Sequence, residues 1–310
     1  MGVPMPDSAA AITLGGAWRR WRWWLAALAV VGIGVAAYFL KPVTGPARNL
    51  TLVGDAARGA YVIRLGGCDA CHTDHDHNGA YLAGGAPLTT PFGTFYPPNI
   101  TPDKQTGIGG WTLAQFSDAI SNGDSPHGNL YPVFPYNDLT LMSDQEVVDL
   151  YAAIMAAPAV AHPTPANEVI FPLNFRLLVS GWKNLFFSPQ RYRNDPSHSA
   201  QWNRGAYLAN GPTHCVACHS PLNALGAVID GEHFAGNPAG GTGGKTPALT
   251  ASALLQDGYT VDGLAQTLKT GITPNAGKVG AEMGPVIRDE TSHWTDADLK
   301  AMATYLLAGK

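Results

Sequence analysis

The sequence has little charge and no excess of basic residues. Lys, Arg, Asp and Glu make up only 14% of the 310 residues, and 19 basic residues stand against 23 acidic ones, a net charge of -4. A nucleic-acid-binding protein would carry a basic patch, so this class is excluded. The low charge and the 45% content of hydrophobic residues fit a membrane-associated or cofactor-rich protein better than a solvated cytosolic enzyme.

The sequence also lacks any segment with the sustained alternation of apolar and polar residues that indicates a strand. We therefore expect a mostly α fold. The 36 glycines and 24 prolines predict many turns and long irregular connections between the helices.

An uncharged run near the N-terminus is long enough to cross a membrane. It covers residues 23–40, 18 residues in all, or about 27 Å as a helix. Arg19, Arg20 and Arg22 precede it, and basic residues remain on the cytoplasmic side of a membrane helix. The sequence predicts a single-pass protein of the inner (cytoplasmic) membrane, with everything after Lys41 in the periplasm.

A cleaved signal peptide is the alternative to this anchor. Small residues at positions 34–37 offer a cleavage site. The apolar run is long, however, and more than 20 residues precede it. These features favour a cytoplasmic leader and an uncleaved transmembrane anchor over residues 1–41.

Beyond the anchor, the same order of motifs occurs twice. The tetrapeptide RGAY stands at 58–61 and at 204–207, and a cysteine follows it at a similar distance in each copy. Each copy ends in a predicted helix, at 143–155 or 295–307, that begins with a Ser or Thr N-cap and acidic residues. We expect two tandem helical domains with long loops, over residues 50–160 and 198–310.

All four cysteines lie in two Cys-x-x-Cys-His motifs, one in each copy. A structural zinc site is disfavoured because the pairs are far apart in sequence and the histidines would have no role. A thioredoxin-like dithiol would need a βαβ context, which is absent. Two thiols at this spacing reach the two vinyl groups of a porphyrin, and the next histidine ligates its iron.

The motifs therefore predict two covalently bound haem c groups. The thioether positions and proximal iron ligands are Cys68, Cys71 and His72 in the first copy, and Cys215, Cys218 and His219 in the second.

Each iron also needs a distal group, and methionine would give a closed electron-transfer site. In the second copy we predict Met283, in the loop before the last helix. In the first copy Phe134 aligns near that position and cannot ligate iron. Met142, just before the helix at 143–155, is predicted there, with His127 or an open site as the alternative.

Two further methionines and the connector have less specific interpretations. Met155 and Met302 lie on the apolar stripes of predicted helices and are expected in the core. Residues 161–197 form a proline-rich connector containing FPLNFRLLVSGWKNLFFSP. It is either packed between the domains or a strip that contacts a membrane or a partner. Its local positive charge comes from Arg176, Lys183, Arg191 and Arg193.

The stretches PFGTFYPPNITPDKQTGIGGWT, LYPVFPY, WNRGAYLANGPTHCVACHSPLNALGA and TSHWTDADLKAMATYL resemble the cytochrome c subunits of membrane-bound bacterial alcohol, aldehyde and gluconate dehydrogenases. The resemblance covers residues 54–310. It implies class I cytochrome c domains that pass electrons from a periplasmic dehydrogenase towards quinone or an oxidase. In different members the dehydrogenase holds molybdopterin, pyrroloquinoline quinone or flavin.

The resemblance also implies site residues. Cys68, Cys71, Cys215 and Cys218 match the thioether positions, His72 and His219 the proximal ligands, and Met283 a distal ligand. Many members have methionine where Phe134 stands, whereas others share the YPxFPY form with a methionine just before the helix, as at Met142. The sequence departs from the common pattern in having two haem motifs where typical subunits have three, and an N-terminal anchor.

The predicted function is electron transfer by a membrane-anchored, periplasmic dihaem cytochrome c, with a dehydrogenase as donor and an oxidase or soluble cytochrome as acceptor. No residue is expected to act as general acid, base or nucleophile. Two alternatives stay open. One is a haem enzyme that oxidises a small substrate, such as a sulfur compound, at an open haem site. The other is a structural subunit of a respiratory complex.

Overall fold

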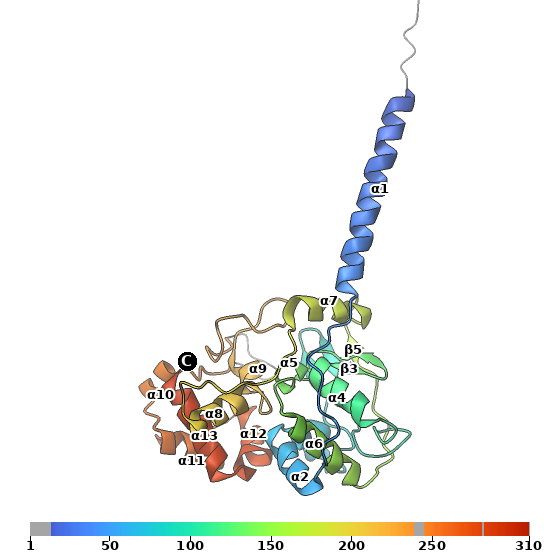
Figure 1. Ribbon diagram of the computed structural model, residues 1–310. Coiled ribbons are helices and arrows are strands. Elements are labelled where there is room, and N and C mark those ends of the chain that lie inside the picture. The colour runs from blue at the N-terminus through green and yellow to red at the C-terminus, as the bar shows by residue number, and fades with distance from the viewer. Residues whose placement is uncertain (1–13, 239–244, 281, 310) are drawn as a thin grey trace, which may run out of the picture. The chain divides into compact units, whose positions relative to one another are not determined.

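The computed structural model describes residues 14–238, 245–280 and 282–309 (Figure 1). Residues 1–13, the first part of the predicted cytoplasmic leader, lie outside the described residues. The contacts between residues divide the chain into two compact units, Met1–Pro42 and Val43–Lys310.

The first unit contains the predicted apolar helix. α1 (Leu14–Phe39) is continuous over 26 residues. Its segment Trp21–Phe39 has a mean hydropathy of 1.6 and none of it is buried. By length and composition this segment is able to cross a membrane, and a signal sequence would meet the same criteria.

The second unit is mostly helical, as the sequence predicted, with a few short strands. Its helical segments are α2 (Ala56–Leu65), α3 (Cys68–His72), η1 (His75–His77), α4 (Leu113–Asn122), α5 (Tyr136–Leu139), α6 (Asp144–Ala156), α7 (Leu177–Phe186), α8 (Ala200–Asn210), α9 (Cys215–His219), α10 (Ala251–Gln256), α11 (Val261–Thr270), α12 (Met283–Asp289), η2 (Thr291–His293) and α13 (Asp296–Ala308).

The strands pair in two small antiparallel sheets. Strands β1 (Leu88–Thr90), β2 (Gly93–Phe95) and β5 (Glu168–Val169) form one sheet in that order, and β3 (Asp124–Ser125) pairs with β4 (Gly128–Asn129). Because β5 belongs to the connector, the connector begins by adding a strand to the hairpin of the first repeat.

The predicted N-caps of the closing helices are confirmed. Ser143 caps α6, and Ser143 and Glu146 form a reciprocal capping box. Thr295 caps α13 through the backbone N–H of Asp298. Both helices pack against the helix that carries RGAY in their own repeat, α6 on α2 and α13 on α8 (Figure 1).

The glycine of each RGAY motif lies where these two helices cross. A Cβ atom on Gly59 would overlap the backbone oxygen of Asp149 in α6, and one on Gly205 would overlap the backbone oxygen of Ala301 in α13. The neighbouring arginines join the same helices. Arg58 Nε lies 2.7 Å from Asp149 Oδ2, and Arg204 Nε lies 2.8 Å from Asp298 Oδ1.

Replacing Gly59 by alanine is therefore expected to destabilise the protein by roughly 1–3 kcal/mol, because the helix backbones have to move apart. Gly110→Ala is the matched control, since a Cβ there meets no atom within 4 Å. Denaturant unfolding of both variants measures the difference. Equal midpoints for the two would contradict the close crossing.

The apolar side chains form two core clusters that share helix α2. Val62 and Ile63 of α2 lie in the first cluster, with residues from 82 to 154. Leu65 of α2 lies in the second cluster, with residues from 206 to 306. Met302 is buried in the second cluster and Met155 packs against the first, as predicted.

Tyrosines of the RGAY motifs join the two repeats in a reciprocal way. The Tyr61 hydroxyl donates to Asp298 Oδ2 of α13 over 2.6 Å. The Tyr207 hydroxyl contacts the Glu146 carboxylate of α6 and accepts from the Ser143 N–H. Burial alone would raise the pKa of Asp298, but hydrogen bonds from Arg204 and Tyr61 hold that pKa below its usual value.

Candidate functional site

Each Cys-x-x-Cys-His motif is a single helical turn that follows an RGAY helix. α3 holds Cys68 to His72 and α9 holds Cys215 to His219, so the two cysteines of each motif lie three residues apart on one face. The residue before each turn is in the left-handed region, Gly67 with φ 58° and His214 with φ 39°. These positions set the direction in which both short helices leave the preceding chain.

The motif histidines are oriented in the same way in both repeats. The Nδ1 atom of His72 lies 2.7 Å from the carbonyl oxygen of Pro98, and that of His219 lies 2.8 Å from the carbonyl oxygen of Pro247. Because a carbonyl oxygen only accepts, Nδ1 is the donor in each case. Burial lowers the pKa of both histidines, so each is neutral near pH 7 with its lone pair on Nε2.

A neutral imidazole held at Nδ1 by a carbonyl is the form in which histidine ligates a metal through Nε2. Pro98 and Pro247 were not among the predicted site residues. A signal for them exists in the sequence: each directly precedes one of the matched triplets NIT (99–101) and ALT (248–250). The direction of their carbonyl groups, however, comes only from the fold.

The four cysteines are unpaired and do not resemble a redox dithiol. None of them forms a disulfide, and Cys71 and Cys218 are exposed. Burial raises the pKa of Cys68 and Cys215 to about 12, whereas the reactive cysteine of a dithiol enzyme has a lowered pKa. Over the described residues, no three His, Cys, Asp or Glu side chains are grouped as a metal site would require.

The fold brings the two motifs close together. His214 Nε2 lies 3.3 Å from the carbonyl oxygen of Gly66. The carboxyl group of Glu290, which is 5% exposed, packs directly on Gly67. Burial raises the pKa of Glu290 to about 8, and Asp289 and Asp69 add to this rise, so the group is largely protonated at neutral pH. Glu290 was not predicted from the sequence as part of the site.

In the first repeat, the structure places Met142 and Cys68 in one cluster. Met142 is 1% exposed and lies in the first core, against which Cys68 and Phe134 also pack. His127, the alternative ligand, is exposed near the β3–β4 turn, with its ring centroid 6.4 Å from that of Trp111. Met283, predicted for the second repeat, is half-buried at the first residue of α12 and is not part of the second core as described.

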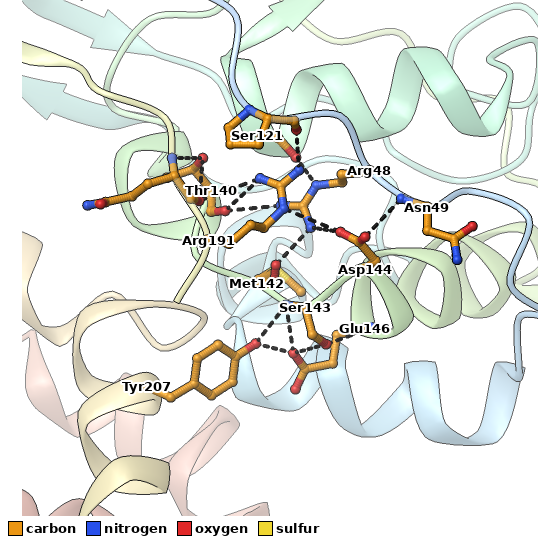
Figure 2. A network of polar contacts seen from close by, with 12 residues as sticks. Arg48, Asn49, Ser121, Thr140, Met142, Ser143, Asp144, Glu146, Arg191 and Tyr207 are labelled. Carbon is orange, nitrogen blue, oxygen red and sulfur yellow. Dashed lines mark hydrogen bonds and ion pairs between the residues drawn. The ribbon is translucent and has the colours of Figure 1, made fainter. Parts of the chain in front are cut away.

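An arginine that no sequence motif singles out holds the backbone around Met142 (Figure 2). The side chain of Arg48 is 3% exposed. Its Nη1 donates to the Met142 carbonyl over 2.7 Å and to Asp144 Oδ1 over 3.1 Å, and its Nη2 donates to the Thr140 carbonyl over 3.1 Å. Its Nε donates to Ser121 Oγ.

A second arginine extends this network (Figure 2). Arg191, from the connector, lies 3.3 Å from Asp144 Oδ1 and donates to the Pro46 carbonyl over 2.7 Å. Burial, and then repulsion from Arg191, lowers the pKa of Arg48 to about 10, so Arg48 remains charged at neutral pH. Together the two guanidinium groups tie residues 46–48, the Met142 segment and the connector to one another.

Comparison with known proteins gives relatives along most of the chain, although no protein-family model matches it. A diheme cytochrome c-type protein of Cereibacter sphaeroides is 36% identical over 288 residues, which is 91% of this chain and 96% of the relative. A subunit of the nicotinate dehydrogenase of Pseudomonas putida is 40% identical over 93% of this chain. The fructose dehydrogenase cytochrome subunit of Gluconobacter japonicus is 35% identical over 90% of this chain.

The chain spans only part of these dehydrogenase subunits, 25% of the nicotinate dehydrogenase subunit and 57% of the fructose dehydrogenase cytochrome subunit. Cytochrome c subunits of alcohol and gluconate dehydrogenases are similar at 35% and 34% identity. The predicted resemblance to dehydrogenase cytochrome c subunits is confirmed.

Proposed function

The chain belongs to the dihaem c-type cytochromes, and from this we propose that it is a membrane-anchored, periplasmic electron-transfer subunit that carries two haem c groups. We place one group at each Cys-x-x-Cys-His motif. The observation that supports this most directly is the arrangement repeated at both motifs, in which unpaired thiols accompany a histidine fixed through Nδ1 to a proline carbonyl.

The residues present fit haem c. In each motif, two thiols one helical turn apart would form the thioethers, and a neutral histidine with its lone pair on Nε2 would ligate the haem iron. When bound, haem c supplies a one-electron couple between ferric and ferrous iron. The chain's own residues fix the orientation of the ligands. The Pro98 and Pro247 carbonyls make the imidazoles better electron donors by accepting from Nδ1.

For the distal ligands we propose Met142 and Met283. Burial of Met142 in the core that also contacts Cys68, and the fixing of its carbonyl by Arg48, support Met142 over the exposed His127. Met283 is supported by its half-buried position at the first residue of α12, before the last helix of the second repeat.

Met142→Leu and Met283→Leu are each expected to convert one haem from low spin to high spin, because leucine keeps the volume but provides no ligand. The midpoint potential of the affected haem should fall by on the order of 0.1 V or more, within the ~0.8 V that axial ligands span. Magnetic circular dichroism with a redox titration of the full-length protein measures both effects.

Met302→Leu is the control, since Met302 is 1% exposed and lies in the second core. It should leave both haems low-spin. A wild-type protein with one high-spin haem, or an unchanged spectrum for Met142→Leu, would refute the assignment of Met142. The haem-enzyme alternative would then become the leading proposal for the first repeat.

We propose a dehydrogenase as the electron donor and an oxidase or soluble cytochrome as the acceptor. The relatives that are dehydrogenase subunits support this choice. The test uses membranes of the source organism supplied in turn with nicotinate, fructose, ethanol and gluconate. One substrate is expected to reduce the haems of this chain and to drive oxygen consumption.

A strain in which both motifs carry serine in place of cysteine provides the decisive comparison. Substrate-driven oxygen consumption should stop in this strain while the dehydrogenase keeps its activity with an artificial acceptor. Unimpaired oxygen consumption would mean that the chain is not the carrier, and would favour a structural subunit.

A further inference from the structure

Helix α7, in the connector, presents apolar side chains to the outside. Leu177 is 60% exposed, Leu178 47% and Leu185 55%. The segment before the helix continues this surface with Phe171 and Phe175, which are 78% and 55% exposed. We call these five residues, together with Phe186, the outer face of the connector.

The inner side of the same helix buries two polar residues beside Val179. Lys183 is 2% exposed, and its Nζ donates to the Gly123 carbonyl over 3.1 Å and to Asn129 Oδ1 over 2.8 Å. Ser180 is also buried and accepts a hydrogen bond from Asn129 Nδ2. Less of the connector's positive charge therefore reaches the surface than its sequence indicates, because Lys183 points inward and Arg191 pairs with Asp144.

A helix that buries lysine and exposes leucine reverses the arrangement favoured in water. Lysine is almost never fully buried unless it is paired, and large exposed apolar patches indicate contact with another apolar phase or surface. The inner face leaves α7 little freedom to turn over, since Lys183 has two acceptors and lies 5.5 Å from the ring centroid of Tyr136. These contacts fix the rotation of α7 and keep the outer face of the connector directed away from the rest of the unit.

The distance along the chain between α1 and α7 indicates which surface covers the outer face of the connector. The candidate membrane segment ends at Phe39, and Gly45, six residues later, is fixed by a hydrogen bond from its N–H to Asn122 Oδ1. Six extended residues reach about 20 Å at most. Gly45 packs against Pro189, whose Cβ would lie 2.8 Å from a Cβ on Gly45, and Pro189 follows the end of α7 by three residues. The end of α7 is therefore tethered near the point where an anchored chain leaves the bilayer.

We propose that the outer face of the connector lies in the interface of the membrane that α1 crosses, with its leucine and phenylalanine side chains among the lipid acyl chains. This inference rests on the proposed membrane anchor. Arg176, just before α7, is exposed, and its Nη1 donates to the Asn129 carbonyl over 3.1 Å. Its remaining N–H groups suit lipid phosphates while the neighbouring leucines insert. Such a contact fixes the orientation of the haem-binding unit relative to the membrane surface. A single flexible tether would leave that unit free to rotate.

Photo-crosslinking in native membranes tests this contact on the full-length protein. Benzoylphenylalanine replaces Leu178 or Leu185, and Leu255, which is 60% exposed in the second repeat, serves as the matched control. After illumination, intact mass spectrometry of the haem-stained band is expected to show phospholipid adducts at 178 and 185 and none at 255. Adducts to another protein at 178 and 185, or lipid adducts at all three positions, would overturn the proposal.

The same spectra separate this inference from the anchor. The intact mass reports whether residues 1–40 are retained in the mature chain. If residues 1–40 are retained and no lipid adducts form at 178 and 185, the membrane contact of α7 is refuted and the anchor is not. A mature chain that lacks residues 1–40 refutes the anchor and also the membrane contact of α7, which depends on the anchor.

Discussion

Replacing Cys215 and Cys218 together by serine is expected to remove one of two haems from the purified protein. Serine does not add to a haem vinyl group, so the second motif would keep no covalent link. α9 is a single turn of five residues and is too short to be stable by itself. His219, whose Nδ1 donates to the Pro247 carbonyl, would be the only residue of the second motif left to hold the haem. Haem content should fall from two to one per chain, with electron transfer to the acceptor abolished.

The reciprocal variant and a matched control complete this test. Cys68→Ser with Cys71→Ser should also leave one haem, with a different midpoint potential, and all four substitutions should leave none. His75→Ala with His77→Ala changes two exposed histidines beside the first motif and should leave both haems in place. Pyridine haemochrome absorbance per mole of protein measures the count. A ratio of two in either double-serine variant would contradict covalent attachment as the means by which haem is held.

Arg48→Met is expected to cost roughly 3 kcal/mol of stability and to disturb the first haem. Methionine fills much of the space but leaves the Met142 and Thr140 carbonyls without their charged donor and removes a partner of Asp144. Buried hydrogen bonds to a charged group contribute about 1.5–3 kcal/mol, and unsatisfied buried groups add to the loss. Urea unfolding should show a lower midpoint with an unchanged slope.

A spectroscopic readout distinguishes positioning from general stabilisation. If Arg48 positions Met142, part of the first haem becomes high-spin in Arg48→Met under native conditions. Arg191→Met is the control, because Arg191 shares Asp144 and the Thr140 carbonyl but forms no hydrogen bond to the Met142 carbonyl. It should lower stability less and leave both haems low-spin. Equal spectra for the two variants would show that Arg48 has no special role at Met142.

The parts of the fold that depend on neighbouring residues were predictable. The Ser143 N-cap with Glu146 three residues later predicted the start of α6, and Thr295 did the same for α13. The Cys-x-x-Cys-His spacing predicted haem attachment, and each motif lies within one helical turn, α3 or α9. The two copies of RGAY predicted a repeated layout, and they lie in the equivalent helices α2 and α8. Each of these signals lies within a few residues of the feature it determines.

The parts that depend on distant residues were not predictable from one sequence. Arg48 lies in a loop without periodicity, and its importance comes from groups more than 70 residues further along the chain, which the fold brings to it. Nothing in the local sequence indicates that Tyr61 and Tyr207 each reach the helix of the other repeat. Lys183 counted as surface charge in the sequence, whereas the fold buries it against Gly123 and Asn129.

The exchange of tyrosines between the repeats has a consequence for how such a chain arises. Tyr61 reaches the start of α13, and Tyr207 reaches the start of α6, so each half offers the same group to the other and receives the same group in return. Surfaces related in this way are the isologous surfaces of a two-fold dimer. A single repeat with these residues would be able to pair with its own copy. Joining the copies in one polypeptide makes that pairing independent of protein concentration.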